Sequence, residues 1–209
     1  MIHANYYIFR RDPTKYWTLA KELHTTIHNA KPNPAHLALV ELEKMGKLKA
    51  IITQNIDDLH QKAGSKKVLE LHGTYKTATC LKCRAKFAYE EGVEKLKRGE
   101  MPPTCSCGGI IKTDLIFFGE ELKPRVFNEV FSWARKADLT IVIGAPMEVL
   151  LSRTLFKVMR ENRGKLILIN LKDISGLKFD LKFIGGQIEK ILPKIVEEVK
   201  RKKNSFKNV

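Results

Sequence analysis

The stretch that decides the fold is TQNIDDLHQKAG, residues 53–64. It follows the apolar run at residues 48–52 and precedes VLELHG at residues 68–73. An apolar, β-rich run that ends abruptly in polar side chains is typical of a buried parallel strand, and open α/β sheets bind ligands at the carboxyl ends of such strands. We therefore expect four polar side chains to line one crevice: Gln54, Asn55, Asp57 and His72. The alternative is an ordinary Asn/Asp turn after a strand, which this stretch alone does not exclude.

Length and composition bound the possibilities. The chain has 209 residues, of which 44% are hydrophobic, so it can bury one full core and we expect one main domain with a small insert. The apolar runs are shorter than a membrane span, and the opening MIHANYYIFRR lacks the order of a secretory signal, which predicts a cytoplasmic protein. The net charge of +15 favours a solvated, lysine-rich surface, with weak, non-specific nucleic-acid binding as a further expectation.

The rest of the chain alternates helical and strand patterns. Asp12 followed by Pro13 predicts the start of a first helix. The patterns predict helices over residues 15–29, 35–45, 59–63, 124–136, 148–162 and 188–200, and strands over residues 48–52, 68–71, 139–143 and 166–169. This alternation predicts an α/β fold, a Rossmann-like parallel sheet with helices on both faces. The strands then end at Thr53, His72, Gly144 and Asn170.

An insert at residues 74–111 interrupts this alternation and contains all four cysteines: Cys80, Cys83, Cys105 and Cys107. Two closely spaced thiol pairs can occupy the four corners of a tetrahedron around Zn²⁺. Disulfides or free buried thiols are the alternative, which the confinement of all four cysteines to one insert makes the less favoured. We predict a zinc-ribbon insert whose metal holds structure only, and a Rossmann-like domain made of residues 1–73 and 112–209.

The ordered set TQNID, LHGT, paired cysteines and FFGE (residues 117–120) is more specific than any one of its members. With these motifs the chain resembles the sirtuins, the NAD-dependent protein-lysine deacylases, from about residue 29 to about residue 196. Further matching pieces are AKPNPAH at residues 30–36, LEKMGKLKAIITQNIDDLHQKAG at residues 42–64, and the Asn170 that ends LILIN. The resemblance implies the sirtuin NAD-binding fold, with NAD and one zinc ion as cofactors.

The resemblance also implies roles for individual residues. In sirtuins the acyl oxygen of an acyl-lysine attacks C1′ of the nicotinamide ribose, nicotinamide leaves, and a histidine acts as general base on the ribose hydroxyl. Carried over, His72 is that base, a role that suits histidine because its imidazole can both take up and release a proton near neutral pH. Asn55 positions a water molecule and the ribose. Further NAD contacts are expected at Gln54, Ile56, Asp57, Gly144 and Asn170.

The FFGE stretch is expected to bind the acyl-lysine substrate. It offers a strand edge that an extended peptide can join by β-addition, with Gly119 and Glu120 on that edge. Phe117 and Phe118 are expected to wall the channel for the lysine methylenes, with an ordinary core position as an equal alternative for Phe117.

Two departures from the sirtuin pattern leave two hypotheses open. The family opens with a strand and a Gly-rich phosphate loop, which do not precede Met1. Gly144-Ala145-Pro146 stands where Gly-Thr-Ser is usual, so two hydroxyls and one amide donor are lost. We expect weakened NAD binding and very low activity from residues 1–209 alone. The protein is then either an NAD-dependent protein-lysine deacylase or a catalytically impaired, zinc-bearing binding or remnant protein.

Overall fold

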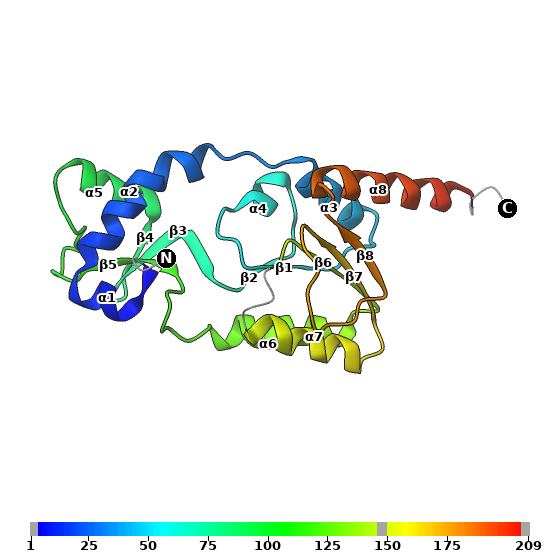
Figure 1. Ribbon diagram of the computed structural model, residues 1–209. Coiled ribbons are helices and arrows are strands. Elements are labelled where there is room, and N and C mark those ends of the chain that lie inside the picture. The colour runs from blue at the N-terminus through cyan, green and yellow to red at the C-terminus, as the bar shows by residue number, and fades with distance from the viewer. Residues whose placement is uncertain (1–3, 146–149, 206–209) are drawn as a thin grey trace. The chain divides into compact units, whose positions relative to one another are not determined.

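The computed structural model describes residues 4–145 and 150–205 (Figure 1). The chain forms two compact units that alternate along the sequence. The cysteine unit takes in the described parts of Met1–Lys31, Ile52–Leu59 and Leu69–Lys123, and the sheet unit those of Pro32–Ile51, His60–Val68 and Pro124–Val209. Among these described residues, no helix combines the length and the apolar character needed to cross a membrane.

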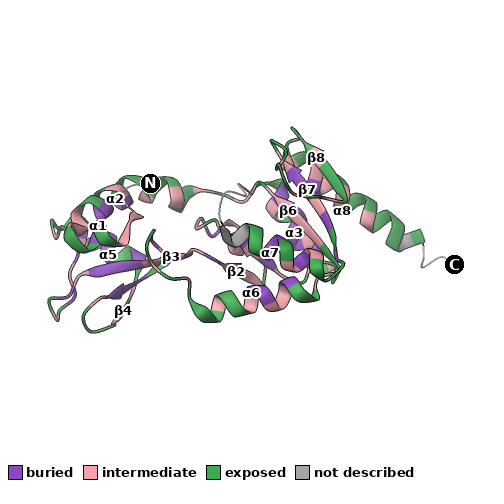
Figure 2. Cartoon of the chain, turned by 60° about the horizontal axis from the view of Figure 1, so that its bottom comes forward, coloured by how far each residue is buried: buried purple, intermediate pink, exposed green. Residues whose placement is uncertain are grey.

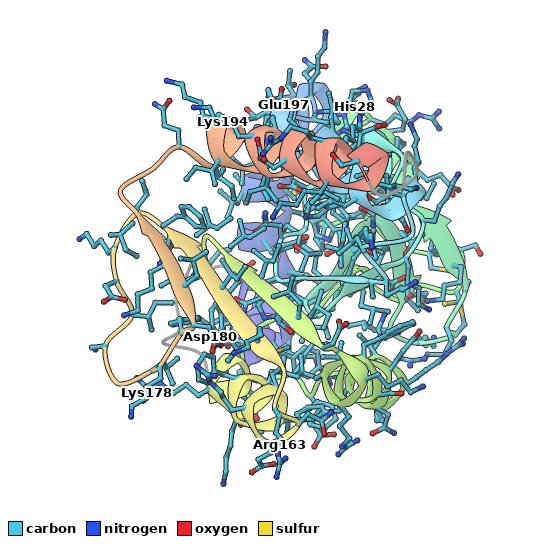
Figure 3. All side chains as sticks on the ribbon, turned by 90° about the vertical axis from the view of Figure 1, so that its right-hand side faces the viewer. His28, Arg163, Lys178, Asp180, Lys194 and Glu197 are labelled. Atoms are coloured by element: carbon cyan, nitrogen blue, oxygen red, sulfur yellow. The ribbon has the colours of Figure 1, made fainter. Side chains whose placement is uncertain are left out.

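The sheet unit is built on three parallel strands that pair in the order β6, β7, β8. These strands are β6 (Leu139–Ile143), β7 (Lys165–Asn170) and β8 (Leu181–Ile184). Its main helices are α3 (Pro34–Lys44), α6 (Pro124–Lys136), α7 (Leu150–Glu161) and α8 (Ile188–Ser205). Figure 3 shows the sheet between α8 on one side and α6 with α7 on the other. The predicted α/β class, with helices on both faces of a parallel sheet, is confirmed.

Strand β7 is buried on both of its faces. Ile169 is 1% exposed and packs with Leu39 of α3 and Leu192 of α8. Because side chains alternate along a strand, Leu166 and Leu168 point to the opposite face, and both are fully buried. A strand covered on both faces carries a continuous apolar run, which is why LILI in this strand could be read as parallel-sheet sequence.

A second, two-stranded sheet pairs β1 (Ile51–Thr53) with β2 (Val68–Glu70), and the short helix α4 (Leu59–Ala63) lies between them in the chain. β1 begins three residues later than predicted, because the end of α3 occupies the chain up to residue 48. Gly46 has a φ of +73°, and the N–H groups of Lys47 and Leu48 both donate to Leu42 O, at 2.9 and 3.1 Å. This left-handed helix ending uses residues that the apolar pattern assigns to the strand.

The cysteine unit contains an antiparallel sheet in the order β4, β3, β5. Its strands are β3 (Gly73–Cys80), β4 (Lys86–Ala88) and β5 (Ile111–Leu115), and its helices are α1 (Tyr6–Arg11), α2 (Pro13–Asn29) and α5 (Tyr89–Lys97). The predicted start of α2 is confirmed, since the Asp12 side chain accepts a hydrogen bond from Thr14 N at 3.2 Å. The predicted division into residues 1–73 with 112–209 and an insert at residues 74–111 stays a prediction.

Helix α2 is fixed to β5 by two buried hydrogen bonds. Trp17 is 0% exposed and donates from Nε1 to Ile111 O at 2.9 Å, while the hydroxyls of Tyr16 and Thr113 lie 2.6 Å apart. Figure 2 shows buried residues in β3 and in the first half of α2 in this unit. The indole of Trp17 also fills the space beside Gly92 of α5, where an added Cβ would lie 2.9 Å from Trp17 Cη2.

Gly92→Ala is expected to destabilise the protein although it replaces a helical glycine. Alanine gains about 1 kcal/mol of helix propensity over glycine. Here the new methyl group collides with a fully buried indole that its Nε1 bond holds in place, and such overpacking costs about 1–3 kcal/mol. Urea unfolding of the zinc-loaded protein should show a lower free energy of unfolding, whereas Lys97→Ala on exposed α5 surface should change it by less than about 0.5 kcal/mol. A more stable Gly92→Ala variant would contradict this packing.

Candidate active site

The carboxyl ends of β1 and β2 bring the TQNID and LHGT motifs together. Leu71 N donates to Thr53 O at 2.9 Å, which aligns the ends of the two strands. His72 Nδ1 then lies 3.1 Å from Gln54 O. Because a carbonyl oxygen only accepts, the hydrogen-bonded Nδ1 carries the proton, and the neutral ring keeps its lone pair on Nε2. His72 therefore has the tautomer that a general base requires.

The rest of the TQNID loop is ordered by hydrogen bonds to its own backbone. Asn55 N donates to Thr53 Oγ1 at 3.0 Å, and Leu59 N donates to Asp57 Oδ1 at 3.0 Å, where α4 begins. The Asn55 side chain is exposed, while Ile56 and Asp57 are half-buried. The alternative of an ordinary Asn/Asp turn is thus partly correct, since one carboxylate oxygen of Asp57 accepts a backbone hydrogen bond at the start of α4.

Asp58 joins this loop to strand β3 through an ion pair that the sequence motifs do not signal. Its backbone has a φ of +59°, a left-handed conformation that Asp tolerates better than most residues. The carboxylate is 7% exposed, and Lys76 Nζ lies 2.6 Å from Asp58 Oδ1. A buried carboxylate is costly without a counter-charge, so Lys76 is part of what keeps the loop in this conformation.

The two phenylalanines of FFGE lie in opposite environments. Phe117 is 2% exposed, and its ring centroid lies 5.4 Å from that of Phe9 and 4.6 Å from that of Tyr16. The core alternative for Phe117 therefore describes its position. Phe118 is 57% exposed, as a residue that contacts substrate would be.

The backbone edge at Phe118 is already paired, contrary to the expected open strand edge. Phe118 N donates to Ala4 O at 2.8 Å, and Tyr6 N donates to Phe118 O at 3.0 Å. Gly119 follows with a φ of +90°, and a Cβ there would lie 2.8 Å from the ring of Tyr7. On the other side of the motif, Ile116 N donates to His72 O at 2.9 Å. One hydrogen bond thus connects the strand leading into FFGE with the proposed general base.

The four cysteines form one cluster, in which all four Sγ atoms lie within 4.8 Å of one another. Cys80 Sγ is 3.5 Å from Cys107 Sγ, and Cys83 Sγ is 3.6 Å from Cys105 Sγ. A tetrahedral Zn²⁺ with Zn–S bonds of about 2.3 Å separates its sulfurs by about 3.8 Å, whereas a disulfide needs about 2.0 Å. The donor set fits a structural zinc ion and does not fit two disulfides.

The backbone around the thiols favours the thiolate form that zinc binds. The N–H groups of Cys83 and Lys82 point at Cys80 Sγ, at 3.5 and 3.4 Å. The hydrogen bond from Cys83, followed by that from Lys82, lowers the pKa of Cys80 to about 6 against the opposing effect of burial. In the second turn, Gly109 supplies space, because an added Cβ would lie 2.5 Å from Cys80 Sγ.

Gly144 and Asn170 belong to the sheet unit, where they follow or end two neighbouring parallel strands. Gly144 N donates to Ile169 O at 3.0 Å, and its φ is +56°. Asn170 donates from Nδ2 to Lys172 O at 2.9 Å. Their expected place at strand carboxyl ends is as predicted, whereas Pro146 of the Gly-Ala-Pro departure lies outside the described residues.

These features define a Rossmann-like α/β protein that combines a polar His/Asn loop at strand ends with a four-cysteine zinc module. The chain belongs to the Sir2 family, whose model matches residues 2–150. It is 40% identical to the NAD-dependent protein deacetylase of Saccharolobus solfataricus, over 93% of this chain and 78% of that protein. It is 39% identical to the NAD-dependent protein deacylase of Pyrococcus furiosus, over 92% of this chain and 78% of the relative.

Solved sirtuin structures share the fold. A Sir2 structure bound to an acetylated peptide superposes with a TM-score of 0.88 at 33% identity, covering 94% of this chain and 82% of that one. Sir2Tm bound to a propionylated peptide gives 0.88 at 34% identity, covering 94% and 83%. The sirtuin resemblance read from the motifs is thereby confirmed.

Gly109→Ala is expected to weaken zinc binding, because its methyl group would displace Cys80 Sγ from the cluster. Gly108→Asn is the matched control: Gly108 has a φ of +76°, which Asn tolerates, and a Cβ there meets no heavy atom within 4 Å. Metal released to a chromophoric chelator under mild challenge should be faster and more complete from Gly109→Ala than from Gly108→Asn. Equal zinc retention by both variants would remove the steric argument.

Lys76→Met is expected to destabilise the protein because it leaves the Asp58 carboxylate buried without its counter-ion. Losing one partner of a fully buried pair costs about 3–5 kcal/mol, and the half-exposed Lys76 reduces this to about 1–2 kcal/mol. Adding Asp58→Asn removes the charge and keeps a residue that accepts a positive φ. The double variant should therefore unfold at a higher urea concentration than Lys76→Met alone; the reverse order would show that the unpaired Asp58 carboxylate does not cause the loss of stability.

Proposed function

We propose that this chain is an NAD-dependent protein-lysine deacetylase or deacylase that moves the acyl group of an acyl-lysine to ADP-ribose and releases nicotinamide. The hydrogen bond between His72 Nδ1 and Gln54 O carries this proposal, because it prepares Nε2 to accept a proton within the TQNID and LHGT motifs. Relatives named as deacetylases or deacylases match more than nine-tenths of the chain at about 40% identity, which favours turnover over a non-catalytic zinc-bearing protein.

The residues present fit NAD. Asn55 is exposed and follows Gln54, whose carbonyl oxygen contacts His72, and Gly144 has open space where a Cβ would stand, so its backbone is accessible to a ligand. When bound, NAD supplies the ribose carbon that takes up the acyl oxygen as nicotinamide leaves. The residues that would hold NAD are Gln54, Asn55, Ile56, Asp57, Gly144 and Asn170.

The roles of the chain's own residues follow from their environments. His72 Nε2 accepts the proton of the ribose hydroxyl, while Gln54 O holds the ring through Nδ1. The Asn55 amide positions a water molecule and the ribose through hydrogen bonds. These roles place proton transfer on one residue and positioning on the neighbouring loop.

Acyl-lysine protein or peptide is the proposed substrate, bound at FFGE. Exposed Phe118 contacts the lysine methylenes, while buried Phe117 supports Phe118 from the core. Gly119 and the Glu120 carbonyl, which follow the stretch that residues 4–6 already pair, are the proposed backbone contacts of the peptide, since Glu120 N already donates to Phe117 O at 3.0 Å. The substrate strand therefore joins the motif after Phe118.

The zinc ion has a structural role in this proposal. Four protein thiolates complete a tetrahedron and leave no position for a substrate oxygen. Residues 74–111 form the zinc-bearing insert, and residues 1–73 with 112–209 form the NAD-binding domain. A cytoplasmic location and weak, salt-sensitive binding of nucleic acid through the basic surface stay predictions.

Replacing the proposed base tests the function. His72→Ala should lower nicotinamide release from NAD and an acetyl-lysine peptide by about 10²–10⁴-fold, the usual contribution of a general base. His28→Ala, in exposed α2 surface, should keep the rate of the unmodified chain. Zinc content and urea unfolding should be unchanged in both variants. Release by His72→Ala at the unmodified rate would exclude His72 as the base.

A further inference from the structure

Lys112 is one of the few buried charged side chains of the cysteine unit, with 6% of its side chain exposed. A buried ammonium group is costly unless hydrogen bonds and an opposite charge compensate it. Burial also lowers the pKa of Lys112, against the raising effect of the neighbouring Glu120 carboxylate. The buried Lys112 ammonium group therefore needs compensating contacts within the protein, which a solvent-exposed lysine would not need.

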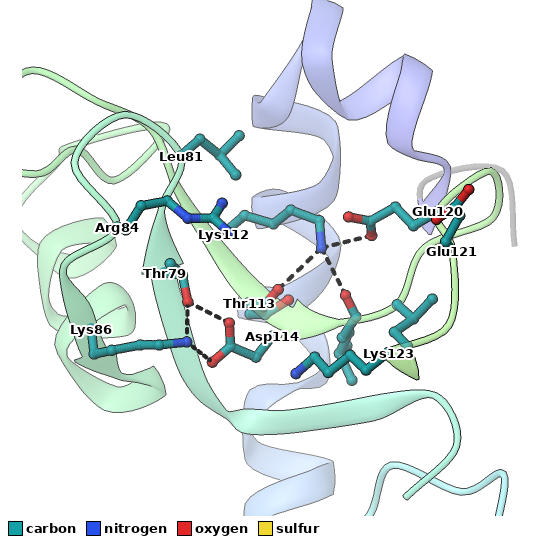
Figure 4. A pocket seen from close by; sticks show the side chains of 12 residues that line it. Thr79, Leu81, Arg84, Lys86, Lys112, Thr113, Asp114, Glu120, Glu121 and Lys123 are labelled. Carbon is teal, nitrogen blue, oxygen red and sulfur yellow. Dashed lines mark hydrogen bonds and ion pairs between the residues drawn. The ribbon is translucent and has the colours of Figure 1, made fainter. Parts of the chain in front are cut away.

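The partners of Lys112 all come from the eight residues that follow it (Figure 4). Nζ lies 2.8 Å from Glu120 Oε2, and it donates to Leu115 O at 2.7 Å and to Thr113 O at 3.2 Å. These three contacts use the three protons of the ammonium group. Nζ also lies 3.9 Å from the centroid of the Phe117 ring, a cation–π contact.

Glu120 completes the arrangement by holding the backbone of the FFGE turn. The same Oε2 atom accepts a hydrogen bond from Phe117 N at 2.7 Å, and Glu120 N donates to Phe117 O at 3.0 Å. Lys112 therefore fixes Glu120, and Glu120 fixes the turn in which Phe117 points inward and Phe118 points outward. Without the ammonium group, the Glu120 carboxylate would be drawn toward solvent and away from Phe117 N.

From these contacts we infer that Lys112 is a positioning residue for the acyl-lysine substrate, which sets the shape of the FFGE turn through Glu120 and Phe117. The inference rests on the proposed function. Lys112 does not touch the substrate in this role, so its loss weakens peptide binding and leaves NAD binding and the zinc cluster unchanged. A lysine that only stabilised the fold would affect all three together.

The test measures binding separately from turnover. Peptide binding is followed by the fluorescence anisotropy of a labelled acetyl-lysine peptide, NAD binding by calorimetry, and zinc by metal analysis. Lys112→Met, which keeps the length and removes the charge, should raise the Kd for the peptide about tenfold or more, because small displacements of a binding edge are costly. The Kd for NAD should change by less than about threefold and zinc should stay at the unmodified stoichiometry, since none of the residues proposed to hold NAD or zinc lies in this turn.

Three further variants separate positioning from stability. Lys112→Arg restores a cation with enough donors, and a cavity of about 260 Å³ beside Lys112 gives room for the larger group, so peptide affinity should recover. Lys123→Met, in the same cavity lining, should leave the peptide Kd unchanged. Lys112→Met combined with Glu120→Gln removes the uncompensated charge; it should regain stability toward urea without regaining peptide affinity.

Two results would overturn the inference: an unchanged peptide Kd in Lys112→Met, or equal increases in the Kd values for peptide and NAD. Failure of the proposed function looks different, since the unmodified chain would then bind the acetyl-lysine peptide but release no nicotinamide. If the unmodified chain does not bind the peptide at all, the inference about Lys112 is wrong as well.

Discussion

The hydrogen bond from Leu71 N to Thr53 O is the constraint on which the proposed active site depends. It aligns the ends of two very short strands, so that Gln54 and His72 leave them side by side. The Nδ1 contact with Gln54 O, the tautomer of His72 and the link to Ile116 all follow from this alignment. A slip of one residue in the pairing of β1 with β2 would turn the side chains that follow β2 to the other face and move His72, the proposed base, away from the loop.

The cysteine unit does more than bind the metal, because its sheet supplies the surface on which α1 and α2 pack. Trp17 and Tyr16 bond to β5 from α2, and the aromatic rings of Phe9, Tyr16 and Phe117 meet in one cluster. Because Phe117 is part of FFGE, the packing of this cluster fixes the position of the motif. The stability of the cysteine unit and the geometry of the FFGE turn, the proposed peptide site, therefore depend on one packed core.

Local pattern predicts much of this structure. Helix α6 and strand β6 have the bounds that periodicity and Pro124 indicate, and the Asp12-Pro13 start of α2 follows from capping chemistry. The motifs likewise predict that His72 lies beside the TQNID loop and that the four cysteines cluster. The bounds of helices and strands depend on residues close in sequence, and the placement of His72 and the cysteines follows from motifs whose residues lie together in the fold.

Features set by distant partners escape sequence reasoning. Whether Phe117 lines a channel or fills the core depends on Phe9, more than a hundred residues earlier. The ion pair Lys112–Glu120 depends on the FFGE turn, and the ion pair Asp58–Lys76 depends on the left-handed backbone of Asp58. In a lysine-rich sequence, no local pattern marks these two lysines as buried or paired. The end of β1 is predictable, but its beginning depends on how α3 terminates.

The pairing of residues 4–6 with Phe118 makes the two segments thermodynamically linked. A molecule that binds the FFGE turn more tightly when these hydrogen bonds are formed also stabilises the ordered form of residues 4–6, by the same free energy. The reverse holds equally: a ligand that contacts the start of α1 and favours these hydrogen bonds would alter the affinity of the FFGE turn for its proposed peptide without touching the turn. The binding of two molecules, one at each segment, would thus be coupled through a pair of backbone hydrogen bonds.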